Sequence, residues 1–376
     1  MENQVPPPLP PQPTSPPPIY ITAPPPARGA GRGWMVLSLV LIVVLGMIMA
    51  GRVFSALAGG GRNITGTESG RHFEEITVEN PLAKDKIAVV PVEGMITSEP
   101  WDPAGRSMVD SIEDQLKLAG KDPNVRAVIL KIDSPGGEVL ASDDISRAII
   151  QFQEKHKKPV IASMGGLAAS GGYYVAAPCQ YIVANELTLT GSIGVIMSTF
   201  NYRGLMDKVG LQPRVFKSGK FKDMLRGSKT PEEIDPAEEQ MIQEMIMETF
   251  GKFKSVVKTG RERAASLNKT NGKTLAQNWE EYADGRILTG KKAHELGFVD
   301  QIGNFQTALD TTRQIAGITG KTHVIRYQEP FSLARVFGMG VKTKAVDPNT
   351  VKLDIGLHLP KLQTGRLYFL APTTMP

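Results

Sequence analysis

Apolar runs alternate with segments of helical period along residues 86–197. β-Branched and apolar runs predict strands at residues 86–92, 125–132, 160–164, 181–184 and 193–197. Amphipathic or small-residue patterns predict helices at residues 107–119, 139–152 and 168–177. Because strands alternate with helices, we expect βαβ units that build a mainly parallel α/β sheet.

The longest helical pattern covers residues 236–263, with Asp235 as its N-cap and Pro236 in its first turn. The polar stretch before it, residues 218–226, is expected to be a loop. After about residue 325 the periodicity is lost, and residues 326–376 are treated as a C-terminal extension of unknown role.

Three further segments precede the α/β region. Residues 1–32 are rich in proline, with 12 of the 28 prolines in the first 26 positions, and predict an extended tail without a core. Residues 33–50 are uncharged and apolar, and as a helix of about 27 Å they would just span a bilayer. Residues 51–84 are interpreted as a linker.

The apolar segment predicts a single-pass membrane anchor. A cleaved signal peptide is the alternative, because Ala56-Leu57-Ala58 resembles a cleavage site. Arginines flank the segment on both sides, so their distribution gives no orientation.

The first candidate catalytic residue is a serine among small residues. Residues 165–174 read GGLAASGGYY, which places Ser170 where a predicted strand gives way to a helix. A helix N-terminus directs unpaired N–H groups toward such a hydroxyl, as a serine nucleophile requires. The alternative is a close-packed turn in which the glycines only permit tight backbone approach.

Two other segments favour the nucleophile. Residues 133–137, DSPGG, end a predicted strand and offer backbone N–H groups for an oxyanion. Residues 216–223 contain three lysines, whereas none of the five histidines has a setting suited to a general base. A lysine serves as a base when its surroundings lower its pKa, by about three units from about 10.4. The residues alone do not choose between Lys220 and Lys222.

These segments, in this order, resemble the signal peptide peptidase A family of serine peptidases, the S49 group. The resemblance covers residues 85–325. It rests on three motifs, DSPGG at residues 133–137, ASGGYYVA at residues 169–176 and LTGSIGVI at residues 189–196. It implies a Ser-Lys dyad of Ser170 and Lys222, with Ser192 orienting the lysine. It assigns Gly171, with Gly136 or Gly137, to the oxyanion hole, and implies the spiral of ββα units shared by Clp proteases and crotonases.

The resemblance also implies a setting and substrates for the enzyme. It implies a catalytic domain on the outer side of the membrane, and cleavage of remnant signal peptides or exported proteins after small or apolar residues. We expect a homo-oligomer in which the dyad is shared between protomers. The alternatives are a catalytically silent membrane scaffold and a crotonase-type acyl-CoA hydratase or isomerase.

Composition and motif content argue against several other classes of protein. The net charge of +5 comes from basic and acidic residues that are mixed along the chain, so we expect no nucleic-acid partner. The lone Cys179 forms no intrachain disulfide, and no Cys or His pair has metal-ligand spacing. No phosphate loop or dinucleotide fingerprint is present. We therefore expect neither a metal nor a cofactor.

Overall fold

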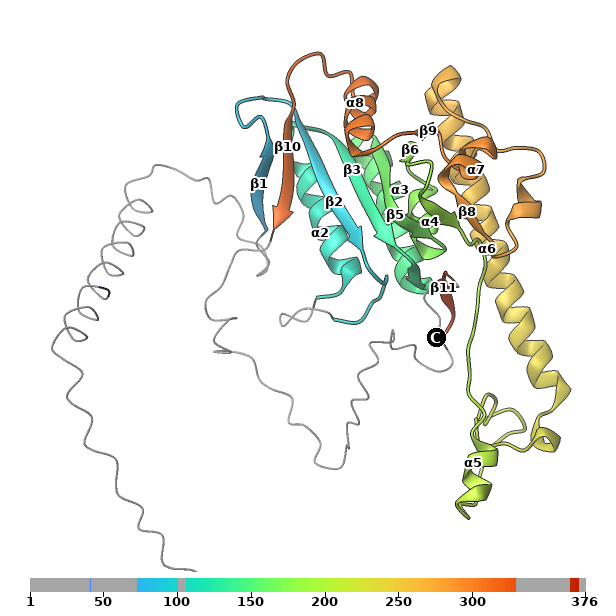
Figure 1. Ribbon diagram of the computed structural model, residues 1–376. Coiled ribbons are helices and arrows are strands. Elements are labelled where there is room, and N and C mark those ends of the chain that lie inside the picture. The colour runs from blue at the N-terminus through green and yellow to red at the C-terminus, as the bar shows by residue number, and fades with distance from the viewer. Residues whose placement is uncertain (1–40, 42–72, 101–105, 329–365, 372–376) are drawn as a thin grey trace, which may run out of the picture. The chain divides into compact units, whose positions relative to one another are not determined.

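A nine-stranded, mostly parallel sheet is the centre of the structure, a computed structural model (Figure 1). The structure describes residues 41, 73–100, 106–328 and 366–371. From residue 73 onward these belong to one unit, Arg71–Pro376, which is distinct from Met1–Gly70. The predicted tail, most of the predicted anchor and residues 51–72 and 329–365 lie outside the described residues.

Five parallel strands form the middle of the sheet, and β1 pairs with β10 antiparallel at one edge. The order along the main path is β1 (Glu74–Glu79), β10 (His323–Gln328), β2 (Lys86–Glu93), β3 (Val125–Ser134), β5 (Val160–Ala169), β6 (Tyr181–Ala184) and β9 (Gln301–Ile302). The predicted strands at 86, 125, 160 and 181 are therefore present. β1 lies in the segment interpreted as a linker.

Helices cover both faces of this sheet. Helices α2 (Met108–Lys121), α3 (Val139–His156) and α4 (Gly171–Ala176) pack on one face, against side chains such as Val90, Leu130 and Ala162. Helix α8 (Phe305–Ile315) packs on the other face, against alternate residues of the same strands such as Ile129 and Ile161. Two-sided burial explains why these strands are continuously apolar.

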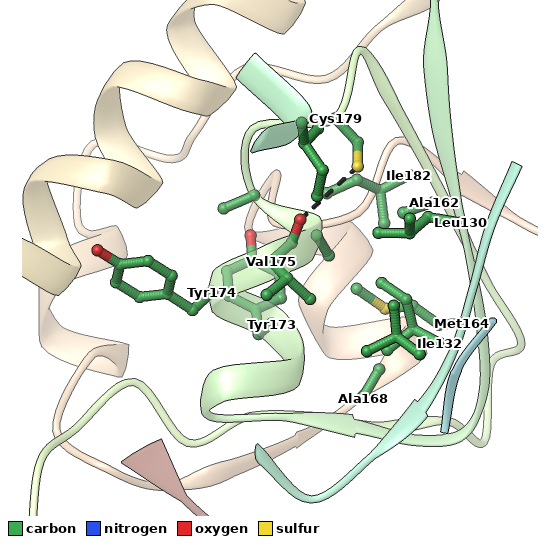
Figure 2. Packing of buried hydrophobic residues seen from close by; sticks show 14 of the residues in the cluster. Leu130, Ile132, Ala162, Met164, Ala168, Tyr173, Tyr174, Val175, Cys179 and Ile182 are labelled. Atoms are coloured by element: carbon green, nitrogen blue, oxygen red, sulfur yellow. Dashed lines mark hydrogen bonds between the residues drawn. The ribbon is translucent and has the colours of Figure 1, made fainter. Parts of the chain in front are cut away.

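Helix α4 is buried along its whole length. Figure 2 shows Val175 and Cys179 near sheet residues such as Leu130 and Ile182, while the ring of Tyr174 points away from the sheet. The Tyr173 hydroxyl donates to the carbonyl of Phe298 at 3.0 Å. These contacts fix the start of α4, and therefore Ser170, relative to the sheet.

Strand β5 pairs with two different neighbours along its length. Its first half pairs with β6, and its second half pairs in parallel with β7 (Leu189–Gly191), which pairs antiparallel with β8 (Ile287–Thr289). The predicted strand at 193–197 is not formed. Ser192 has a positive φ of 50°, which interrupts the extended backbone, and only Ile196 makes an isolated bridge there.

The segment after residue 197 leaves the sheet. It carries α5 (Arg203–Lys208) and leads into α6 (Pro236–Asn268), whose N-terminal end lies near α5 and away from α4 (Figure 1). Asp235 caps α6 by accepting from Ala237 N–H at 2.9 Å, as predicted. Helix α7 (Gly290–Glu295) and 3-10 turns at Pro231–Glu233, Lys269–Asn271 and Trp279–Tyr282 complete this part.

A short second sheet pairs segments far apart in the sequence. Strand β4 (Gly136–Glu138) pairs antiparallel with β11 (Tyr368–Leu370). The extension after residue 325 therefore contributes the end of β10 and all of β11. Among the described residues, no helix combines the length and apolar character needed to cross a membrane.

Candidate active site

Ser170 occupies the sharp bend between β5 and α4. Its backbone has φ 53° and ψ −116°, an unusual conformation for a residue with a side chain. The Oγ atom is buried and has no hydrogen-bond partner among the described residues. An unpartnered buried hydroxyl costs free energy, so it is expected where a substrate or base completes the site.

Ser192 lies beside Ser170 because β5 and β7 run in parallel register. Ala168 pairs with Thr190 and Ala169 with Gly191, so the next positions are Ser170 and Ser192. The N–H of Ser170 donates to the carbonyl of Gly191 at 2.8 Å, and the N–H of Ser192 donates to the carbonyl of Arg286 at 2.8 Å. Both serines are buried.

The three candidate oxyanion glycines converge next to Ser170. A Cβ placed on Gly171 would lie 3.1 Å from both Gly136 Cα and Gly137 N, and 2.7 Å from the Ser142 hydroxyl. Gly136 has a φ of +100°, which favours glycine. The N–H of Gly136 donates to the Ser134 hydroxyl at 3.1 Å. Because this bond uses the N–H of Gly136, Gly137 is the better candidate for the second oxyanion donor beside Gly171.

Lys222 is exposed, lies in a turn within residues 217–226, and makes no hydrogen bond to Ser170 Oγ. Two other lysines of this turn are ion-paired, Lys217 with Asp223 at 2.8 Å and Lys220 with Asp235. Lys222 has no ion pair among the residues that the structure describes. This difference separates Lys222 from the two lysines that the sequence offered beside it. Because Ser170 Oγ has no partner, the two candidate dyad residues do not meet within this chain.

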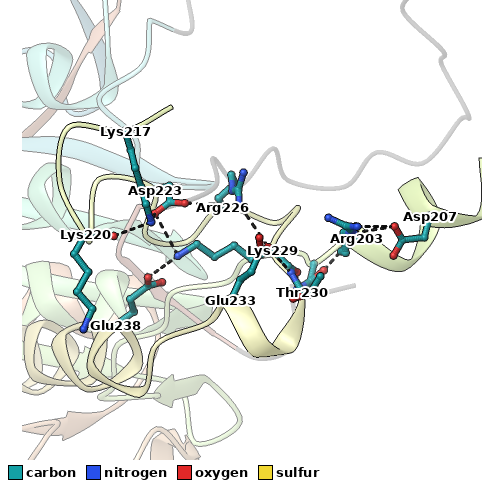
Figure 3. A network of polar contacts seen from close by, with 11 residues as sticks. Arg203, Asp207, Lys217, Lys220, Asp223, Arg226, Lys229, Thr230, Glu233 and Glu238 are labelled. Atoms are coloured by element: carbon teal, nitrogen blue, oxygen red, sulfur yellow. Dashed lines mark hydrogen bonds and ion pairs between the residues drawn. The ribbon is translucent and has the colours of Figure 1, made fainter. Parts of the chain in front are cut away.

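A buried ion-pair network attaches this turn to the beginning of α6 (Figure 3). Lys229, only 2% exposed, pairs with Asp223 at 3.4 Å and with Glu238 of α6. Burial lowers the pKa of Lys229, but hydrogen bonds and attraction from Glu238 and Asp223 outweigh that effect and raise it overall. Asp223 follows Lys222 directly, so the network fixes the backbone of the candidate base. The sequence analysis did not identify Lys229.

Two of the three described histidines, His156 and His323, make contacts away from this site. His323, on β10 next to the edge strand β1, contacts the hydroxyl of Thr77 at 2.8 Å. The ring of His156 packs against Phe152, with 5.3 Å between centroids. Among the described residues there is also no cluster of His, Cys, Asp and Glu that could hold a metal ion.

The sequence analysis missed a segment beside this site. Phe369, in β11, lies opposite Gly137, and Arg366 pairs with Glu138 of β4. The apolar run of residues 367–371, LYFLA, is a strand-like signal within a region to which we assigned no chemistry.

Comparison with known proteins places this arrangement in a family. The model of Peptidase family S49 matches residues 152–319, which include Ser170, Ser192 and Lys222. A protein of Enterococcus faecium named as a signal peptide peptidase, SppA, is 34% identical over 310 residues, or 80% of this chain and 83% of the relative. A Synechocystis protein named as a protease is 40% identical over 210 residues, or 56% of this chain and 70% of the relative.

Protease 4 of Salmonella typhi is 32% identical over 268 residues, which are 71% of this chain but 40% of the relative. The sequence-based recognition is thereby confirmed, and so is the expectation of a mixed α/β fold with a large, mostly parallel sheet. The chain belongs to peptidase family S49, the signal peptide peptidase A group, and is a serine-type peptidase.

Proposed function

We propose that this chain is a membrane-anchored endopeptidase that cleaves peptide bonds through a Ser170–Lys222 dyad. The observation that carries the proposal is the unpartnered Oγ of Ser170, buried where the backbones of Gly137 and Gly171 come close together. A nucleophile next to two backbone N–H groups that can stabilise an oxyanion is the arrangement that acyl transfer requires.

In the proposed reaction, neutral Lys222 takes the proton of Ser170 while Oγ attacks the carbonyl carbon of the substrate. Gly137 and Gly171 donate to the oxyanion that develops. The lysine then protonates the leaving amine as the C–N bond breaks, and water hydrolyses the acyl-enzyme. Ser192, beside Ser170 in the β5–β7 register, orients the amine of Lys222.

Lys222 would come from a neighbouring protomer of a homo-oligomer. The separation of the Lys222 turn from α4 supports this arrangement (Figure 1). Exposed apolar side chains of the same segment also support it, because such surface is buried when protein subunits associate. They are Phe200, Tyr202, Leu205, Val209, Leu211 and Phe216.

The substrates proposed are remnant signal peptides and exported or membrane proteins. Residues 33–50 would anchor the enzyme by one span, with the catalytic unit on the outer side and arranged as a spiral of ββα units. The name of the Enterococcus faecium relative supports the substrate class. The site needs no cofactor, and a nucleic-acid partner is not proposed.

A fluorophosphonate probe tests the proposal directly. We expect it to label the detergent-purified protein at Ser170, as mapped by peptide mass spectrometry. Ser170→Ala should abolish both labelling and peptide cleavage without changing oligomer size, because one hydroxyl contributes little to packing there. Ser146→Ala, at a buried serine of α3, is the matched control and should retain both. An unlabelled, folded protein would instead favour the scaffold or the acyl-CoA hydratase.

A further inference from the structure

Strand β11 lies between two segments that border Ser170. On one side it pairs antiparallel with β4, with Phe369 opposite Gly137. On the other side Tyr368 exchanges two backbone hydrogen bonds with Ile196, at 3.0 and 3.1 Å. β11 is therefore held as an extended peptide by main-chain bonds on both edges, which is how proteins bind peptides by β-augmentation.

The register brings the Phe369 carbonyl to the candidate oxyanion hole. Val139 N–H donates to Leu367 O at 3.3 Å, and Ala371 N–H donates to Pro135 O at 2.9 Å. In an antiparallel ladder the pair between them, Phe369 with Gly137, is also a hydrogen-bonding pair. A Cβ on Gly136 would lie 2.0 Å from Phe369 O and 2.6 Å from Gly171 N. The carbonyl oxygen and the Gly171 N–H thus lie against the same face of Gly136.

The side chain of Phe369 fills an aromatic pocket. It is fully buried and stacks on Tyr174, with 4.8 Å between centroids and 23° between planes. The ring of Phe253, from α6, lies 4.6 Å from it. The Tyr174 hydroxyl donates to Asp143 at 2.7 Å, which fixes the wall of the pocket. Tyr174 lies one helical turn after Ser170, so the pocket adjoins the nucleophile.

A charged contact holds the same segment at its beginning. Arg366 pairs with Glu138 of β4, and Ser98 donates to Glu138 through both its N–H and its hydroxyl, at 3.0 and 2.6 Å. The arginine is about half exposed, whereas Phe369 is buried in the core. Arg366 can therefore be changed without opening a cavity.

We infer that residues 366–371 occupy the peptide-binding channel of Ser170 in place of a substrate. Phe369 takes the position of the residue before the scissile bond, and the Phe369–Leu370 bond lies where a substrate bond would be attacked. A substrate must displace this segment, and the pocket of Tyr174 and Phe253 selects an aromatic or large apolar residue. The inference rests on the proposed function and adds a specificity pocket and its internal occupant.

The labelling rate of Ser170 with a fluorophosphonate in the full chain tests the inference. Arg366→Glu places two like charges together at Glu138 and should increase the rate about tenfold. Phe369→Ala should also increase it, provided that thermal unfolding shows a folded protein. Arg326→Glu, an exposed arginine on β10, is the matched control and should leave the rate unchanged.

A second measurement uses the hexapeptide Arg-Leu-Tyr-Phe-Leu-Ala, blocked at both ends. It should slow the labelling of the Arg366→Glu protein, whereas the same peptide with aspartate replacing phenylalanine should not. The inference would be overturned if Arg366→Glu were labelled at the wild-type rate or more slowly. It would also be overturned if the two peptides had equal effects. In each of these cases the proposed function stands. Absence of labelling in every protein would overturn both.

Discussion

Ser170 donates its backbone N–H to the carbonyl oxygen of Gly191 at 2.8 Å, and this bond places Ser192 beside the nucleophile. The two serines share an unusual backbone, with φ values of 53° and 50°. Each follows the last paired residue of its strand, at the carboxyl end of parallel strands where α/β proteins bind ligands.

Lys222→Ala should be as inactive as Ser170→Ala, because nucleophile and base act as one unit and their effects do not add. Lys217→Ala and Lys220→Ala, which remove ion-paired lysines, should retain most activity. Steady-state cleavage of a fluorogenic peptide measures all four. An essential Lys220 together with a dispensable Lys222 would refute the assignment of the base.

The same assay as a function of pH reports the protonation of the base. The rate should rise with pH, because only the deprotonated base can accept the proton of Ser170. A profile without such a rise would argue against a lysine base.

Mixing inactive Ser170→Ala and inactive Lys222→Ala protomers should restore part of the activity if the dyad forms between subunits. An intact dyad then forms at each interface where the Lys222→Ala protomer supplies Ser170 and the Ser170→Ala protomer supplies Lys222. The measurement is peptide cleavage after subunit exchange, with each variant alone as the control. No recovery, despite exchange shown by mass spectrometry, would mean that both residues must come from one chain.

Gly171→Ala should reduce kcat by at least about 100-fold, the usual cost of losing one oxyanion donor. The added Cβ would lie 2.7 Å from the Ser142 hydroxyl and 3.1 Å from Gly137 N, so the backbone at Gly171 would have to shift. Gly251→Ala on α6 is the matched control, because nothing lies within 4 Å of its added Cβ. It should leave kcat unchanged and stabilise the helix by up to about 1 kcal/mol. Equal kinetics for both variants would remove Gly171 from the oxyanion hole.

Lys229→Met should lower the free energy of unfolding by about 3–5 kcal/mol at neutral pH, because it leaves Glu238 buried and unpaired. Denaturant unfolding measures this loss. Lys254→Met, which removes a partly exposed pair with Glu280, should cost much less than Lys229→Met. Adding Glu238→Leu to Lys229→Met should recover most of the stability.

The stabilisation by Lys229 should also depend on pH. The pKa of Lys229 is raised in the folded state from its ordinary value of 10.5, so the folded protein holds this proton more tightly. The contribution is complete below about pH 10.5 and is lost as the pH rises through the folded-state pKa. A difference between wild type and Lys229→Met that grows above pH 10.5 would contradict the network.

The sequence by itself determined most of the α/β framework. Apolar runs marked β2, β3, β5 and β6, because strands buried on both faces contain few polar residues. The glycines around Ser170 marked the bend, since close backbone approach excludes a side chain at positions such as Gly171.

Only the tertiary structure decided what depends on long-range pairing. The sequence could not place Phe369 against Gly137 or bury Lys229 beside Glu238, because no local pattern encodes a contact between distant segments. It also predicted a strand at 193–197, whereas in the structure β7 ends at Gly191, Ser192 has a positive φ, and only Ile196 forms a bridge. Local composition fixes the elements, whereas the register between strands and the burial of charges follow from how the chain folds back on itself.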